Sequence, residues 1–356
     1  MFMNTDGSVD STVEINDSTT NGPELEDDDS FGRSVANIGD LDGDGVDDLA
    51  VGAPYDDNLG SNQGVIHIMF MNANGSVKST EEIHGTTTNG PTLGNGWWFG
   101  WSVENVGDID GDGKNEIAAG AIRDPSGGDT KGAVNIMFMN DDGSGSIDST
   151  IEINDLTTNG PTLNLGDRFG YSIANIGDLD GDGNGDLAVG AAYDDGGGTN
   201  RGAVHIMFMG SSGSVKSTVE INDSTVNGPT LSNADQFGTS IDQIGDLNGN
   251  GINDLAVGAQ YDDDGGLNRG AVHIIYMHSS ISRTAEVSLS ETLSFTDSLS
   301  KEADILISET LSMTDTATGA KETREQTIPD QTLALTDLSL IHICRCRRYY
   351  LCRSRW

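Results

Sequence analysis

The chain repeats itself at a nearly constant interval, and this repeat limits its possible folds more than any other feature. The tripeptide Asn-Gly-Pro begins at Asn21, Asn89, Asn159 and Asn227, at spacings of 68, 70 and 68 residues. A Phe-Gly pair follows each tripeptide by ten residues. Such self-similarity is typical of repeat architectures, in which one supersecondary unit cannot bury its own faces and stacks on its neighbours.

Each repeat contains four short segments of β-strand character. They are a segment after the Phe-Gly pair, a DLAVGA-like segment, a GVIHIMFM-like segment and an STVEIND-like segment, separated by Gly, Asn, Asp and Pro. In the last of them Val219 and Ile221 alternate with polar residues, as in a half-buried strand. Four antiparallel strands at a fixed period predict one blade of a β-propeller. We therefore predict an all-β fold, with four blades of 68–70 residues within residues 1–278.

The chain opens inside a predicted strand, because Met1–Asn4 matches Met69–Asn72 of a later repeat. One interpretation is a fragment of a larger propeller that has lost upstream blades and a signal peptide. The other is a closed propeller, in which the segment near Thr12–Asn16 completes the last blade, which ends at Met277 without its own fourth segment. Four blades is the low end for propellers, which favours the fragment.

The period stops after the last blade. Residues 279–337 are rich in Ser, Thr and Glu and poor in apolar residues, which predicts a stalk or linker. Residues 338–356 carry five Arg, no acid and all three cysteines, and Leu338–Ile343 is what the adapter-like sequence CTG TCT CTT ATA CAC ATC encodes. We interpret residues 338–356 as a translated sequencing-adapter artefact, not as a basic tail that binds a partner, and set them aside.

The rest of the chain is strongly acidic. Residues 1–337 hold 57 acids against 13 basic residues, a formal charge of −44, and no cysteine. This charge excludes a nucleic-acid or anionic-membrane binder that works through a basic face. No run of about 18 apolar residues is present, so we predict no membrane insertion in this chain. Such an excess of acids suggests bound cations.

Four acidic loops carry the clearest chemical signal. They read DLDGDGVDD, DIDGDGKNE, DLDGDGNGD and DLNGNGIND. Side-chain oxygens at positions 1, 3, 5 and 9 come from Asp40, Asp42, Asp44 and Asp48; Asp108, Asp110, Asp112 and Glu116; Asp178, Asp180, Asp182 and Asp186; and Asp246, Asn248, Asn250 and Asp254. Backbone carbonyls at position 7 come from Val46, Lys114, Asn184 and Ile252. Oxygen ligands at alternate positions, without His or Cys, predict up to four Ca²⁺ ions.

An EF-hand is the obvious competitor for these loops. That motif needs a bidentate Glu at position 12 between two helices. Position 12 is Val51, Ala119, Val189 and Val257 here, and the flanking segments read as strands. The EF-hand is therefore excluded. The fourth loop has only two carboxylates, so we expect it to bind calcium most weakly.

Together the Phe-Gly pair, the DxDGDGxxD loop and Gly52-Ala53-Pro54 resemble the FG-GAP repeat of the integrin alpha-subunit β-propeller and its prokaryotic relatives. The resemblance covers about residues 1–278. It implies a calcium-stabilised propeller of a secreted or cell-surface protein, serving adhesion or ligand binding. In that family the metal sites stiffen the propeller and do not hold the ligand. The sequence departs from the family because Gly-Ala-Pro occurs only once and the period is longer than usual.

The second repeat departs from the pattern of the other three. Trp97, Trp98 and Trp101 stand where the other repeats have mostly polar residues. Exposed aromatic residues suit a binding hot spot or a sugar-stacking platform, and these three are our candidate ligand-binding residues. The alternative is packing between blades.

Other residues recur at the same position of several repeats, and we therefore interpret them as structural. His67, His205 and His273 share one repeat position. The Tyr-Asp-Asp triplets at Tyr55, Tyr193 and Tyr261 either add oxygens to the metal loops or cap turns. No nucleophile–base pair stands out from the repeat, so we predict that the chain is not an enzyme.

Three functions stay open at this point. The first is a calcium-binding propeller that binds an unknown protein or carbohydrate ligand at a surface. The second is the propeller scaffold of a secreted lyase or hydrolase. The third is a purely structural spacer in a large surface protein.

Overall fold

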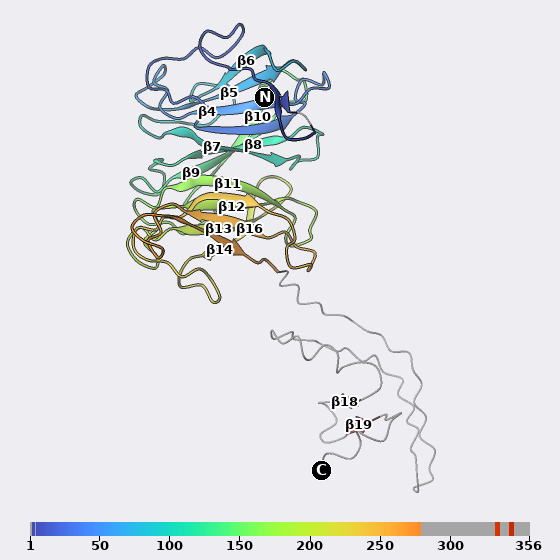
Figure 1. Ribbon diagram of the computed structural model, residues 1–356, viewed down its shortest axis with the longest axis vertical. Coiled ribbons are helices and arrows are strands. Elements are labelled where there is room, and N and C mark those ends of the chain that lie inside the picture. Colours follow the sequence, from blue (N-terminus) through green and yellow to red (C-terminus); the bar gives the residue numbers. More distant parts are fainter. Residues whose placement is uncertain (1, 4, 279–331, 335–341, 345–356) are drawn as a thin grey trace, which may run out of the picture. The chain divides into compact units, whose positions relative to one another are not determined.

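The computed structural model describes residues 2–3, 5–278, 332–334 and 342–344 (Figure 1). The chain divides into two compact units, Met1–Ser279 and Ser280–Trp356. The described residues form strands and turns only, which confirms the predicted all-β class. Within this part of the chain, no helix has the length and apolarity to cross a bilayer.

The first unit contains four antiparallel sheets whose strands pair in chain order. The first sheet is β3 (Ser34–Gly39), β4 (Asp48–Ala53), β5 (Val65–Met71) and β6 (Val77–Ile83). The second is β7 (Phe99–Gly107), β8 (Glu116–Ala121), β9 (Ala133–Met139) and β10 (Ile147–Ile153). The third is β11 (Phe169–Gly177), β12 (Asp186–Ala191), β13 (Ala203–Met209) and β14 (Val215–Ile221). The fourth is β15 (Phe237–Gln243), β16 (Leu255–Ala259) and β17 (Ala271–Ile275).

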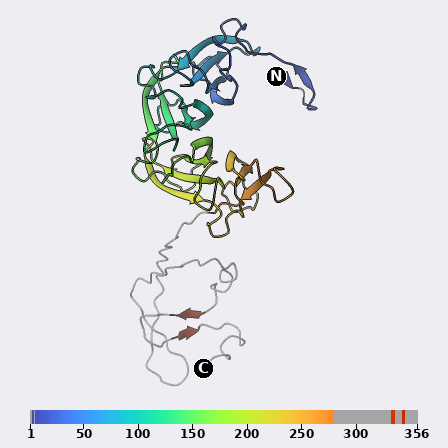
Figure 2. The ribbon, with the colours of Figure 1, turned by 90° about the vertical axis from the view of Figure 1, so that its left-hand side faces the viewer.

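These sheets are the four predicted propeller blades. Figure 2 shows them following one another along an arc, from the blade of β3 to the blade of β15. The last blade has three strands, and no described strand pairs with the free edge of β17. At the N-terminus β1 (Phe2–Met3) pairs with β2 (Val9–Ser11). In this structure the N-terminal segment therefore does not complete the last blade.

The second unit is described only at one short ladder. Strands β18 (Thr332–Ala334) and β19 (His342–Cys344) pair antiparallel. The rest of the predicted stalk, residues 279–337, and of the predicted adapter artefact, residues 338–356, lies outside the described residues.

The apolar pattern of the sequence decides which strand is central. The VIHIMFM segment of β5 is buried along its whole length, because it has a strand on each edge and packs on both faces. The outer strand β6 exposes the polar middle of VKSTEEI and buries only Val77 and Ile83 at its ends. The core lies between blades. One cluster joins Ile66 and Ile68 of the first blade to Phe99 and Met137 of the second.

Blades also touch backbone to backbone, at glycines that recur in register. A Cβ added to Gly120 would lie 2.1 Å from the carbonyl oxygen of Gly170 in the next blade. Gly52 and Gly190 meet the following blade in the same way. The Ser102 hydroxyl donates to the same Gly170 carbonyl at 2.7 Å. Only glycine allows so close an approach.

Candidate metal centres and an aromatic–arginine cluster

The four acidic loops connect the first two strands of each blade. Their first aspartate organises the turn. Asp40 Oδ1 accepts a hydrogen bond from the N–H of Asp44 at 2.9 Å, and its Oδ2 accepts one from Gly45 at 2.8 Å. Gly45 has a φ of 90°, in the left-handed region, which explains glycine at position 6. The third loop repeats these bonds around Asp178.

In three loops the acids converge. Ligand atoms of the residues at positions 1, 3 and 9 lie within 4.8 Å of one another. The groups are Asp40, Asp42 and Asp48; Asp108, Asp110 and Glu116; and Asp178, Asp180 and Asp186. Carboxylates at this separation repel one another, and a cation among them removes that repulsion. Oxygen-only donors fit the predicted calcium.

The position 5 side chains lie outside these groups of three and hold the turn. Each accepts a hydrogen bond from the N–H at position 7, two residues on. The pairs are Asp44 with Val46, Asp112 with Lys114, Asp182 with Asn184, and Asn250 with Ile252. In the fourth loop, the Asn248 amide donates to Asp254 Oδ1 at 3.3 Å. That loop therefore offers Asp246 and Asp254 as its only carboxylates.

The position 9 acid is buried and ties the loop to the blade. Asp48 is fully buried, and its two oxygens accept from the N–H groups of Leu41 and Met71, each at 2.9 Å. The second loop differs, because Glu116 Oε2 accepts from Ile109 while its buried Oε1 has no protein partner. Burial and the neighbouring aspartates raise the pKa of Glu116 to about 8. An orphaned buried carboxylate oxygen is what a bound cation would satisfy.

Two lysines were missed by the sequence analysis. Lys78 Nζ lies 2.6 Å from Asp42 Oδ2 and 2.7 Å from Asp44 Oδ2. Lys216 bridges the corresponding aspartates of the third loop. The second blade has Asp148 at this position of its outer strand. The in-register difference between VKST and IDST was the signal that could have found them.

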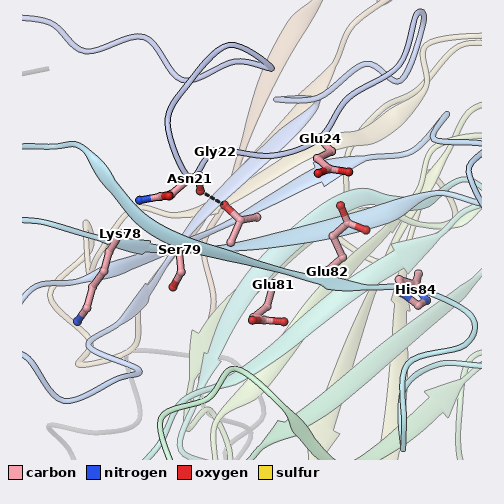
Figure 3. Close-up of a pocket in the computed structure, with 9 residues that line it drawn as sticks. Asn21, Gly22, Glu24, Lys78, Ser79, Glu81, Glu82 and His84 are labelled. Carbon is pink, nitrogen blue, oxygen red and sulfur yellow. Dashed lines mark hydrogen bonds between the residues drawn. The ribbon is translucent and has the colours of Figure 1, made fainter.

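Figure 3 shows a surface hollow beside the outer strand β6, lined by Glu24, Glu81 and Glu82 among others. Lys78 extends away from these three glutamates. Its ion pairs are made with the first metal loop instead.

Aromatic side chains gather at one end of the first strands of the blades. The acidic loops lie at the other end of these strands. The ring of Trp98 stacks on Trp101 at 5.5 Å with an interplanar angle of 16°. Tyr55 of the first blade meets Trp98 edge-on at 5.1 Å, and Tyr171 of the third blade lies 5.2 Å from Trp101. Trp101 is only 9% exposed. The Trp98–Trp101 pair thus bridges three blades.

The third candidate tryptophan lies apart from this stack. Trp97 packs on its own connection, where a Cβ at Gly94 would lie 2.6 Å from its indole Nε1. Trp97 and Trp98 are half-buried. The structure therefore brings together two of the three tryptophans singled out from the sequence.

Arginine side chains cover several of these rings. The guanidinium carbon of Arg33 lies 4.1 Å from the Trp101 ring centroid, and that of Arg123 lies 4.5 Å from the Trp98 centroid. Arg168 lies 3.9 Å from the centroid of Tyr193. These are cation–π distances.

The in-register histidines and Tyr-Asp-Asp triplets serve the scaffold. His205 is buried against the Phe169 ring, and burial lowers its pKa to about 4. Asp56 and Asp194 each accept a hydrogen bond from the N–H two residues on, at 3.1 and 2.6 Å. The turn-cap interpretation is confirmed for these aspartates.

Comparison with known proteins identifies the repeat. Residues 31–69, 169–207 and 237–275 match the FG-GAP repeat. The chain contains FG-GAP repeats. The first, third and fourth acidic loops lie inside the matched segments, and the same motif order recurs in the second blade.

Integrin alpha subunits are similar to these FG-GAP repeats. Integrin alpha-PS2 of Drosophila melanogaster is 31% identical over 253 residues, which are 69% of this chain and 16% of the relative. Integrin alpha pat-2 of Caenorhabditis elegans is 29% identical over 247 residues, 68% of this chain and 19% of the relative. Integrin alpha-4 of Xenopus laevis is 32% identical over 168 residues, 46% of this chain and 14% of the relative. The chain thus spans less than a fifth of the length of these relatives, and the resemblance predicted from the motifs is confirmed.

The FG-GAP motif has a physical reason in this structure. Phe99, Phe169 and Phe237 are fully buried between blades. The glycine after each Phe brings its carbonyl against the glycine of the preceding blade's Gly-Ala pair. The motif therefore marks the contact between neighbouring blades, and the acidic loop lies at the other end of the same strands.

Proposed function

We propose that the chain is a calcium-binding propeller of a secreted or cell-surface protein, serving adhesion or ligand binding. The observation that carries the proposal is the convergence of three acids in each of three loops, with oxygen donors only. Calcium accepts six to eight oxygen ligands in flexible geometry, which such loops can supply with their carbonyls and water. Similarity to integrin alpha subunits supports the adhesive role and the surface location.

The bound ions would act on stability. Each loop joins the first two strands of a blade, so an ion there would fix the hairpin and neutralise its acids. The second loop is the best prepared, because Glu116 Oε1 is buried without a partner. The fourth loop, with two asparagines, would bind most weakly.

Ligand binding would take place at the other end of the blades. Strand β7 runs nine residues from Phe99 to Gly107, so about 25 Å separates the aromatic cluster from the second loop. An ion in the loop cannot contact a ligand held at Trp98 and Trp101. We propose this face for a protein or carbohydrate ligand, and we propose no catalytic role for the recurring buried acids.

Calcium titration of the full chain by isothermal calorimetry tests this proposal. We expect at least three ions to bind, and Asp110→Asn to remove one of them. Asp141→Asn is the matched control, because Asp141 is exposed and lies outside the loops. Absence of calcium binding, or equal stoichiometry in Asp110→Asn and the unsubstituted chain, would contradict the proposal.

A further inference from the structure

Three register positions of the repeat meet at the face opposite the metal loops. They are the residue before the Phe of each Phe-Gly pair, the residue two after that Phe, and the residue two after the Gly-Ala pair. Each of the first three blades places one arginine here, at a different position each time, as Arg33, Arg123 and Arg168. The repeat explains why these side chains lie at this face. It does not explain why one of them is an arginine in each blade, so the presence of the arginines requires another reason.

Five of the six remaining positions, all except Ser30, form a continuous row of rings across the three blades. In order they are Tyr55, Trp98, Trp101, Tyr171 and Tyr193, with successive centroids 5.1, 5.5, 5.2 and 6.1 Å apart. Each arginine lies over a ring of this row. A guanidinium stacked by its face keeps its N–H edge free for another partner. The cluster is therefore a set of hydrogen-bond donors whose orientation is fixed by stacking.

These donors have no acceptors within the described residues. The side chains of Arg33, Arg123 and Arg168 form no ion pair or hydrogen bond there, although acids dominate the chain. By contrast, Lys131 and Arg201 each pair with an aspartate of the outer connections. The indole Nε1–H of Trp101 is likewise buried without a partner in this part of the molecule. A buried donor left unpaired is costly, so an acceptor from outside would be favoured.

We infer that this aromatic–arginine cluster binds carboxylate side chains of a protein partner. The planar fork of arginine matches a carboxylate in two hydrogen bonds, and the Trp101 indole adds a third donor. Guanidinium groups cover faces of the Trp98, Trp101 and Tyr193 rings, which a sugar would need for stacking. Trp, Tyr and Arg are the residues that dominate protein–protein hot spots.

The net charge of the molecule restricts the partner further. A densely acidic partner would be repelled by this chain, whose formal charge is −39. Screening limits that repulsion to about 8 Å at physiological salt. The expected ligand is therefore one or two Glu or Asp residues in a segment with few other acids. The inference rests on the proposed ligand-binding role and not on calcium.

The test follows the indole Nε1–H resonances of the full chain in excess calcium by NMR. The probe is a blocked nonapeptide of Gly and Ser with two Glu, and its control has Gln in place of both Glu. We expect the Trp101 resonance, assigned with Trp101→Phe, to shift with the Glu peptide only. Arg33→Gln and Arg168→Gln should each weaken this binding about tenfold. Arg269→Gln, in the last blade and outside the cluster, should leave it unchanged.

Four outcomes would overturn the inference. The first two are equal binding of the Gln peptide, and binding that survives the Arg33→Gln, Arg168→Gln double substitution. The other two are a response to the acidic disaccharide digalacturonate without one to the Glu peptide, and no response to any probe. Calcium titration of the same samples separates the two proposals, because normal calcium binding without a peptide response removes this inference alone. Retention of the calcium-dependent unfolding midpoint shows that each variant is folded.

Discussion

At the scale of single residues, Lys78 and Lys216 distinguish the first and third metal loops from the second. Their ammonium groups lie at the position 3 and position 5 carboxylates, and the position 3 carboxylate belongs to the group of three that would hold a calcium ion. The lysine is thus a tethered cation that would compete with a metal ion. The second loop has no such competitor, since Asp148 takes the lysine position.

Removing this competitor should tighten calcium binding. We predict that Lys78→Met, which keeps the apolar stem, raises the calcium affinity of the first loop about three- to tenfold, since exposed ion pairs contribute up to about 1 kcal/mol each. The measurement is calorimetric titration. Lys131→Met is the matched control, because Lys131 pairs with Asp155 outside the loops. Unchanged or weaker affinity in Lys78→Met would show that the lysine does not compete.

A buried pair of aspartates predicts a second residue-level effect. Asp167 and Asp194 are both buried, and burial together with the neighbouring Asp194 raises the pKa of Asp167 well above its usual value. The folded state therefore keeps a proton that the unfolded chain releases. Stability from this group is present at low pH and is lost as pH rises from about 4 toward neutral.

Asp167→Asn should remove this loss. The amide keeps the shape of the carboxyl group without its charge, so we expect the variant to be more stable at pH 8 by on the order of 1 kcal/mol. The two chains should converge near pH 4. Urea unfolding at both pH values measures the difference, with Asp141→Asn as the exposed control. A variant that is less stable at pH 8 would refute the account of this pair.

The candidate site could be predicted from the sequence only where its residues are close along the chain. The loop ligands follow one another within nine residues, so their convergence follows from the local turn. Lys78 reaches its loop from a strand 34 and 36 residues away, and the Arg33–Trp101 contact joins two blades. Neither contact has a local signature.

At the scale of elements, strand order and blade number followed from the repeat, because each blade pairs strands that are neighbours in sequence. The arrangement of the N-terminal segment could not be predicted in this way. Met1–Asn4 resembles a third strand of a blade, yet β1 pairs with β2 alone. Which edge a strand joins depends on the stacking of whole blades, and sequence periodicity does not record it.

The contact between blades predicts a position-specific glycine effect. Gly120→Ala would place a Cβ 2.1 Å from a backbone oxygen of the next blade, and we expect a loss of about 3 kcal/mol or more of unfolding free energy. Gly258→Ala is the same register position in the last blade. There the one close contact of the Cβ is with the Ser240 hydroxyl, which can rotate away, so we expect a loss below about 1 kcal/mol. Equal effects in urea unfolding would contradict this picture of blade contact.

At the scale of the whole molecule, the acidic loops both connect the strands of the fold and concentrate its negative charge. Four calcium ions would change the formal charge of residues 1–337 from −44 to −36, so the metal relieves local repulsion and leaves the surface acidic. The loops and the aromatic–arginine cluster lie at opposite ends of the inner strands. Under the two proposals, stability would depend on one end of the propeller and recognition on the other.

The most direct measurement of the central claim is thermal unfolding of the full chain, first in excess calcium and then in excess chelator. An ion that binds only the folded state stabilises by about 2.7 kcal/mol per site at 100 Kd, so three sites predict a midpoint at least about 10 °C higher in calcium. Asp178→Ala should reduce that rise. An equal midpoint with and without calcium, in a chain that unfolds cooperatively, would contradict the calcium-stabilised propeller.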